Sequence, residues 1–179
     1  MSALNKMLNF GLILLLSLSL ALASTLHASE WDQARLQLEK PQTITVYRDA
    51  NCQCCHKWIE HLEKHHFEVI DQISNDMATI KQKLGMPNNM ASCHTAVIND
   101  YVIEGHVPAD DIKQLLIDKP AHIEGLSVPQ MPVGTPGMEM GSRKDHFIVF
   151  SFDQDAQYQM FNAYQTNAEN NYLPLNSAE

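Results

Sequence analysis

The stretch that decides the fold is Asp49-Ala50-Asn51-Cys52-Gln53-Cys54-Cys55-His56-Lys57-Trp58, because it places three of the chain's four cysteines within four residues. The run before it, 44–47, is β-branched and aromatic, which favours a strand, whereas the run after it carries apolar residues at helical spacing. The cysteines are therefore predicted to lie at a strand-to-helix turn. The first N–H groups of a helix are unpaired and its dipole is positive there, so a thiolate at Cys52 would be favoured.

The N-terminus has the pattern of a secretory signal. Lys6 is a sparse positive region, 8–20 is apolar, and Ala21-Leu22-Ala23 is a small-x-small cleavage site. We expect 1–23 to be a signal peptide, 24–165 to form one domain, and 166–179 to be a flexible C-terminal tail. An uncleaved membrane anchor is the alternative, and no later segment is apolar enough to span a bilayer.

Charge and cysteine content limit the possible partners and the state of the thiols. Lys and Arg number 12 against 21 Asp and Glu, a formal net charge of −9, which argues against nucleic-acid or anionic-membrane binding. A cationic partner fits better. In the oxidising compartment that an exported, periplasmic protein meets, four cysteines are expected to be paired, metal-bound or catalytic.

The remaining pattern predicts an α/β domain with the element order β-α-β-α-β-β-α. Expected strands are 43–47, 67–73, 95–98 and 101–104, and expected helices are a short one at 31–40, one after Cys52, and two more at 77–84 and 108–117. This is the order of a thioredoxin-like fold, which places a Cys-x-x-Cys pair at the end of its first strand. A Met/Gly/Pro-rich loop is expected at 120–145, followed by a C-terminal β-hairpin at 147–152 and 158–161.

Cys54 makes the motif more specific than a plain Cys-x-x-Cys. A dithiol reaction needs Cys52 and Cys55 only, so the third sulfur suggests a soft metal, with Cu(I) and Zn(II) as candidates. A disulfide from Cys52 or Cys54 to the distant Cys93 is the purely structural alternative.

Cys93 is predicted to supply a fourth sulfur. It lies immediately before the third expected strand, and in a thioredoxin-like fold that loop faces the start of the first helix. Redox thioredoxins carry a proline there, and its absence between Ser92 and Ala96 weakens the disulfide-exchange interpretation. The expected strands 95–98 and 101–104 are joined by Asn99-Asp100, the turn chemistry of a tight hairpin. His94 and His106 flank this hairpin and are candidate ligands, although a single histidine is as often a surface or core residue.

Methionines and a histidine pair complete the list of candidates. Met131 and Met138 lie in the Gly/Pro loop, where a thioether gains little from packing and can bind Cu(I), so they favour copper over zinc; filling an irregular core edge is the alternative. His61 and His65 are spaced i, i+4 on a polar helix face, where solvation is expected, and we leave them out of the site.

Ordered matches along the chain resemble the CopG-like copper-resistance proteins. They are Val46-Tyr47, Cys52-Gln53-Cys54-Cys55 with Lys57-Trp58, Ser92-Cys93-His94-Thr95-Ala96, Glu104-Gly105-His106-Val107-Pro108, and the loop from Gly125-Leu126 through Val128-Pro129, Met131-Pro132 and Gly134 to Pro136-Gly137-Met138-Glu139. The resemblance covers 44 to about 140. It implies an exported thioredoxin-like protein that binds copper through its cysteines and helps the cell to tolerate excess metal.

The resulting hypothesis is a periplasmic copper-binding protein in which Cys52, Cys54, Cys55 and Cys93 hold Cu(I), with His94, His106 and a loop methionine completing the shell. Thiolate sulfur can bridge metals, so more than one copper ion is possible. The expected partners are copper ions and other periplasmic copper-handling proteins. The alternatives are a thiol-disulfide oxidoreductase using Cys52 and Cys55, and an enzyme in which copper and the cysteines change oxidation state together.

Overall fold

The computed structural model describes residues 29–175. The expected signal peptide, 1–23, lies outside these residues. Within the described part of the chain, no helix has both the length and the apolar character that a bilayer crossing would require.

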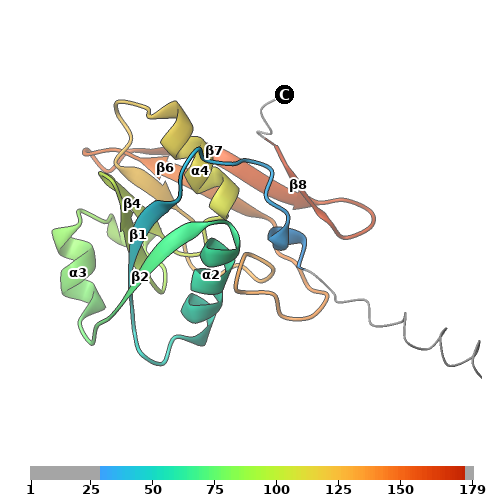
Figure 1. Ribbon diagram of the computed structural model, residues 1–179, viewed down its shortest axis with the longest axis horizontal. Coiled ribbons are helices and arrows are strands. Elements are labelled where there is room, and N and C mark those ends of the chain that lie inside the picture. Colours follow the sequence, from blue (N-terminus) through green and yellow to red (C-terminus); the bar gives the residue numbers. More distant parts are fainter. Residues whose placement is uncertain (1–28, 176–179) are drawn as a thin grey trace, which may run out of the picture.

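One mixed sheet of eight strands, in the order β2-β1-β3-β4-β5-β6-β7-β8, runs through the molecule (Figure 1). The strands are β1 Gln42–Arg48, β2 Phe67–Ile73, β3 Thr95–Ile98, β4 Tyr101–Glu104, β5 Gly125–Ser127, β6 Phe147–Phe152, β7 Tyr158–Thr166 and β8 Tyr172–Pro174. The helices are η1 Glu30–Asp32, α2 Gln53–Lys64, α3 Met77–Lys83, η2 Asn88–Met90 and α4 Ala109–Asp118.

The predicted order β-α-β-α-β-β-α is present from β1 to α4. β2 pairs with β1 in parallel, as a crossover through α2 requires, and the hairpin β3–β4 pairs antiparallel, as its Asn99-Asp100 turn predicted. The α/β class and the C-terminal hairpin β6–β7 are confirmed. The thioredoxin-like assignment stays a prediction.

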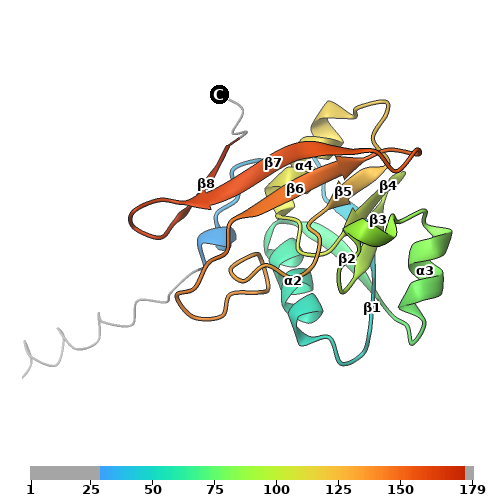
Figure 2. The same ribbon diagram turned by 180° about the vertical axis from the view of Figure 1, so that it is seen from behind.

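α2 and α4 pack against the sheet through one apolar core. Trp58 and Leu62 of α2 and Ile112 of α4 are fully buried in the same cluster as Ile44 and Val46 of β1. α4 crosses β6 and β7, in front of them in Figure 1 and behind them in Figure 2. α3 differs, since it has no buried side chain.

The register of β1 and β3 decides where the cysteines meet. The two strands are antiparallel, with Tyr47 opposite Thr95 and Thr45 opposite Val97. The end of β1 therefore lies beside the beginning of β3. Because Cys52 follows β1 and Cys93 precedes β3, both cysteine-bearing turns are at the same edge of the sheet.

The helix expected at 31–40 is wrong, because only η1 forms there. Asp110 of α4 accepts hydrogen bonds from the backbone N–H groups of Arg35 and Leu36, at 2.9 and 3.3 Å. These donors are thus satisfied by α4 and not by helical bonds within their own segment, and 33–40 has no helix.

The expected loop at 120–145 contains a strand that the pattern did not reveal. β5 pairs in parallel with β4 and antiparallel with β6, and so joins the two halves of the sheet. A Cβ at Gly125 would lie 1.9 Å from the carbonyl oxygen of Val102, so glycine is required for the two strands to approach. A three-residue strand containing glycine carries too little periodicity to be predicted.

The C-terminal segment also differs from the flexible tail expected at 166–179. Within the described residues, β7 extends to Thr166 and β8 pairs with it, Thr166 opposite Tyr172. Tyr172 is buried among aromatic rings, with ring centroids 5.2 Å from Trp31 and 5.4 Å from Phe147. Its hydroxyl donates to the carbonyl of Asp145, at 2.8 Å. Because the sequence around β8 is polar, the pattern did not predict that Tyr172 anchors this strand to the core.

Replacing Tyr172 with alanine should lower the free energy of unfolding by about 3 kcal/mol, as expected for emptying a buried aromatic site. Leu173→Ala is the matched control, since its side chain is 52% exposed; it should cost less than about 0.5 kcal/mol. Urea denaturation of both variants measures the difference. Equal, small effects would show that β8 is not anchored to the core.

Candidate metal and thiol site

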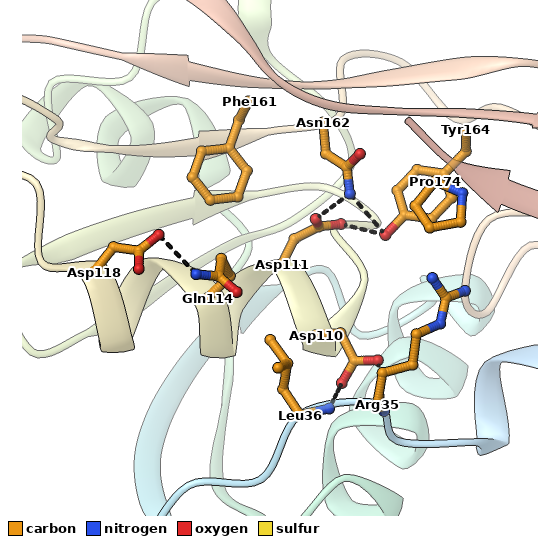
Figure 3. Close-up of a pocket in the computed structure, with 10 residues that line it drawn as sticks. All are labelled: Arg35, Leu36, Asp110, Asp111, Gln114, Asp118, Phe161, Asn162, Tyr164 and Pro174. Atoms are coloured by element: carbon orange, nitrogen blue, oxygen red, sulfur yellow. Dashed lines mark hydrogen bonds between the residues drawn. The ribbon is translucent and has the colours of Figure 1, made fainter. Parts of the chain in front are cut away.

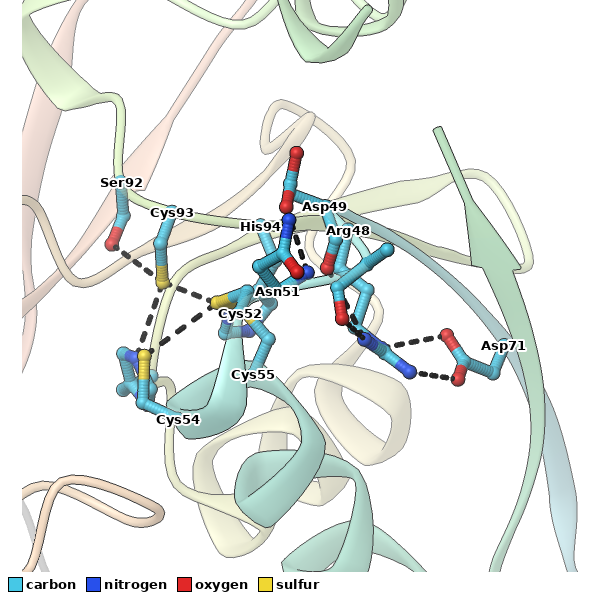
Figure 4. The surroundings of a disulfide bond; sticks show 12 residues. Arg48, Asp49, Asn51, Cys52, Cys54, Cys55, Asp71, Ser92, Cys93 and His94 are labelled. Atoms are coloured by element: carbon cyan, nitrogen blue, oxygen red, sulfur yellow. Dashed lines mark hydrogen bonds and ion pairs between the residues drawn. A yellow bond between two sulfur atoms is a disulfide. The ribbon is translucent and has the colours of Figure 1, made fainter. Parts of the chain in front are cut away.

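The cysteine motif lies at the N-terminus of α2, where it was predicted. Cys52 is the N-cap residue and makes no side-chain capping bond, whereas Cys55, one turn into the helix, is fully buried. The two are joined by a disulfide, with Cα atoms 5.3 Å apart (Figure 4). The structural alternative of a disulfide to Cys93 is therefore wrong, because the bridge closes within the motif.

All four sulfur atoms lie within 4.8 Å of one another. Cys54 and Cys93 are free, and the sulfur of Cys54 is 3.6 Å from that of Cys52. Cys93 thus faces the motif across space, as the fold argument predicted. Sulfur in a disulfide is a poor metal ligand, so a site that uses all four atoms requires the Cys52–Cys55 bridge to be reduced first. That these sulfurs bind metal stays a prediction.

His106 presents an unprotonated ring nitrogen to Cys93. Its Nδ1 lies 2.8 Å from the carbonyl oxygen of Pro136, so Nδ1 carries the proton and donates it. Nε2 is then unprotonated and faces the Cys93 sulfur at 3.3 Å. Burial lowers the pKa of His106 to about 4, which keeps the ring neutral at ordinary pH. A neutral imidazole oriented by a carbonyl is the usual form of a metal-ligating histidine.

His94 contacts the same sulfur from another side. Its Nδ1 is 3.2 Å from Cys93 Sγ, and its ring is fully buried 4.4 Å from the ring of Trp58. Nε2 has no hydrogen-bond partner among residues 29–175. A buried N–H without an acceptor is costly, so the proton belongs on Nδ1, which donates to sulfur. Burial also lowers the pKa of His94 well below its ordinary value.

The electrostatics around Cys93 favour its protonated form in the metal-free protein. Burial, followed by the charge of the Cys54 thiolate, raises the pKa of Cys93 to about 12. The thiol is therefore a weak nucleophile, and a bound metal would have to displace its proton. Cys93, His94 and His106 form a second group of side chains whose ligand atoms lie close enough to hold an ion.

The backbone of the Gly/Pro loop reaches the site. Pro136 orients His106, and Gly137 (φ +82°) lies against the backbone of Cys54 and Trp58. Met131 is 49% exposed. Met138 is partly buried next to Gly137. Both methionines stay predictions as ligands.

Sequence reasoning did not identify the contributions of Pro136 and Gly137. Both work through main-chain atoms, which carry no residue-specific chemical signal. The available hint was the density of glycine and proline in the loop, which indicated function without naming the positions.

His61 and His65 are buried, so the expectation of a solvated pair is wrong. His61 Nε2 accepts a hydrogen bond from Ala109 N at 3.0 Å, and His65 Nε2 lies 2.5 Å from the Trp31 carbonyl. Lys113 Nζ is 3.4 Å from the remaining nitrogen of His65. The pair therefore belongs to the packing of α2 against α4 and the N-terminal segment, and leaving it out of the site is consistent with these contacts.

A cavity of about 440 Å³ lies elsewhere, between the N-terminal segment, α4 and the last two strands (Figure 3). Its wall contains the buried Asp111, which accepts hydrogen bonds from Asn162 and from the Tyr164 hydroxyl at 2.7 and 2.8 Å. Burial raises the pKa of Asp111 to about 6. No cysteine or candidate ligand lines this cavity, so it is separate from the cysteine cluster.

Comparison with known proteins agrees with the motif. The family model "Protein of unknown function, DUF411" matches residues 90–138. A solved structure titled "Copper resistance protein copG- Form 2" is 46% identical, with a TM-score of 0.67, and the match covers 70% of this chain and 100% of the other. The form 1 structure is 47% identical, with a TM-score of 0.66, and the match covers 70% and 98%. A comparison with curated protein sequences found no match.

Gly137→Ala should be more destabilising than Gly141→Ala by about 1–3 kcal/mol. A Cβ at Gly137 would lie 2.7 Å from Trp58 N and 2.8 Å from Cys54 O, which are backbone atoms that cannot move aside. Gly141 has a similar positive φ, +74°, with nothing within 4 Å, so it controls for the backbone strain alone. Thermal unfolding of the two variants gives the comparison. Equal losses would mean that the loop does not pack on α2.

Proposed function

Since the chain belongs to the CopG family of copper-resistance proteins, we propose that it is an exported, periplasmic protein that binds Cu(I) for copper resistance. The observation that carries the proposal is the convergence of four cysteine sulfurs within 4.8 Å, beside the Nε2 lone pair of His106. Thiolate and imidazole suit Cu(I), and carboxylates are absent from both candidate ligand groups in the described residues.

The disulfide determines when the full site exists. Reduction of the Cys52–Cys55 bond takes up two electrons and two protons and yields two thiols, so the chain then has four. Each thiol that binds copper releases its proton. A periplasmic thiol reductant or reduced glutathione-type thiol would supply the electrons, and the state that uses all four thiols to bind copper is the reduced state of the motif.

The sulfur geometry supports more than one ion. Cys54 and Cys93 remain available when Cys52 and Cys55 are bridged, and His106 faces Cys93, so one ion can be held without reducing the bridge. Thiolates can be shared between ions, and four of them in so small a volume allow a cluster. His106 is the better-prepared nitrogen ligand, while His94 donates to the sulfur. Met131 and Met138 are proposed only as outer thioether ligands.

Export is proposed from the N-terminal signal pattern and from the chemistry of the site. Clustered thiols exposed to an oxidising compartment persist when they are bridged or metal-bound, and both states are available to these four. Copper ions are the proposed ligand, and other periplasmic copper-handling proteins are the proposed partners.

Anaerobically reduced protein should bind several Cu(I) ions per chain, and Cys54→Ser should lower that number, because Cys54 can bridge ions. Titration with Cu(I) against a chromogenic Cu(I) chelator measures the stoichiometry. The unreduced protein is the control and should bind fewer ions, since two sulfurs are occupied in the bridge. One ion or none in the reduced wild type, or no change in Cys54→Ser, would contradict the cluster.

A thiol-disulfide oxidoreductase is the second candidate, because the observed bridge joins the two cysteines that such an enzyme would use. It predicts insulin reduction by the metal-free protein that survives Cys54→Ser and is lost in Cys52→Ser. The copper-binding proposal predicts a rate no higher than that of the thiol reductant alone. Turnover with that pattern of variants would therefore replace the proposed function.

A further inference from the structure

The carboxylate of Glu104 is fully buried at the end of β4. It contacts the loop formed by residues 92–95, which carries Cys93. Three donors surround it. Oε1 accepts from the backbone N–H of Ser92 at 2.6 Å and from Lys81 Nζ, and Oε2 accepts from the Thr95 hydroxyl at 2.5 Å. A buried carboxylate is tolerated only when it is paired and hydrogen-bonded, and this one is both.

Two of these three donors belong to the residues on either side of Cys93-His94. Ser92 and Thr95 flank Cys93-His94 on either side, so one carboxylate holds both ends of the loop. The backbone of Gly105 holds the middle, because its N–H donates to the carbonyl of His94 at 3.0 Å. A Cβ at Gly105 would lie 2.6 Å from Ser92 Cβ, which shows how closely β4 and the loop approach.

Lys81 links α3 to this loop. Its Nζ forms the ion pair with Glu104 and also donates to the Thr95 hydroxyl at 2.7 Å. The lysine side chain is only 15% exposed, although α3 buries no residue completely. The pair is thus a specific connection from a helix without a fully buried residue to the residues that flank Cys93.

We propose that the Lys81–Glu104 pair is a positioning device for the copper site, which holds Cys93 at the distance from the motif that shared copper binding needs. The inference rests on the proposed function. Neither residue touches a cysteine sulfur or would touch copper, and both act through Ser92 and Thr95. No other described side chain joins the two ends of this loop.

Glu104→Gln should weaken Cu(I) binding by the reduced protein by about 10- to 100-fold, the usual cost of losing a group that orients a metal ligand. Glutamine has the same size as glutamate, but its amide NH₂ is a hydrogen-bond donor. It would face at least one of the three groups that donate to Glu104, which are Ser92 N, Thr95 Oγ1 and Lys81 Nζ. The ultraviolet thiolate-to-Cu(I) charge-transfer spectrum should shift as well. In reduced, metal-free protein, iodoacetamide should alkylate Cys93 faster, as measured by mass spectrometry.

Lys81→Met tests the other half of the pair, and Lys83→Met is the matched control. Lys83 is exposed on the same helix, and its side chain makes no hydrogen bond or ion pair within the described residues. Its replacement should therefore leave the Cu(I) affinity, the charge-transfer spectrum and the Cys93 alkylation rate unchanged. Lys81→Met alone leaves a buried charge and should weaken Cu(I) binding. Combined with Glu104→Gln, the effects should be less than additive, because each change removes the same interaction.

The inference is overturned if both single variants remain folded by circular dichroism and keep the wild-type affinity, spectrum and alkylation rate. It is also overturned if the Cu(I) affinity of the variants falls only in proportion to their unfolded fraction, the charge-transfer spectrum is unchanged, and the loss of affinity in the double variant equals the sum of the two single losses. If wild-type protein binds no Cu(I), the proposed function fails, and the Cys93 alkylation rates still decide whether the pair positions the loop. If Glu104→Gln does not fold, Lys81→Met and the double variant decide.

Discussion

The antiparallel pairing of β1 with β3 is the constraint on which the site depends. Tyr47 lies opposite Thr95, so the turn that leaves β1 and the loop that enters β3 must share one edge of the sheet. Cys52 is in that turn and Cys93 is in that loop. Two segments about forty residues apart therefore meet without a covalent bond between them, and the sulfurs come together because the sheet brings their backbones together.

Three further features determine how the groups of the site are placed where the two segments meet. α2 holds three cysteines in one turn, the Pro136 carbonyl selects the tautomer of His106, and Gly137 lets the loop backbone approach Cys54. The site is thus built largely from main-chain contacts. Such contacts are rigid, and rigidity would suit the proposed copper site, whose ligands would have to stay close while the disulfide between two of them is reduced.

Elements with a clear period could be predicted from the sequence. The strand 67–73 and the hairpin 95–98 with 101–104 have the predicted bounds, and their order led to the correct expectation that Cys93 faces the motif. Features that depend on distant partners could not. β5 needs Val102 beside Gly125, and β8 needs the aromatic rings around Tyr172. His61 is buried because α4 packs on it, and the spacing of apolar residues along α2 does not predict which other faces of that helix are covered.

X-ray absorption at the copper edge reports which atoms surround the metal, and it therefore tests the proposed thiolate site most directly. Anaerobically reduced, Cu(I)-loaded protein should show a first shell dominated by sulfur, a minor nitrogen contribution from His106, and a copper–copper scattering path. A first shell of nitrogen and oxygen alone would contradict the thiolate site. A sulfur shell without copper–copper scattering would contradict the cluster and leave a site for single ions.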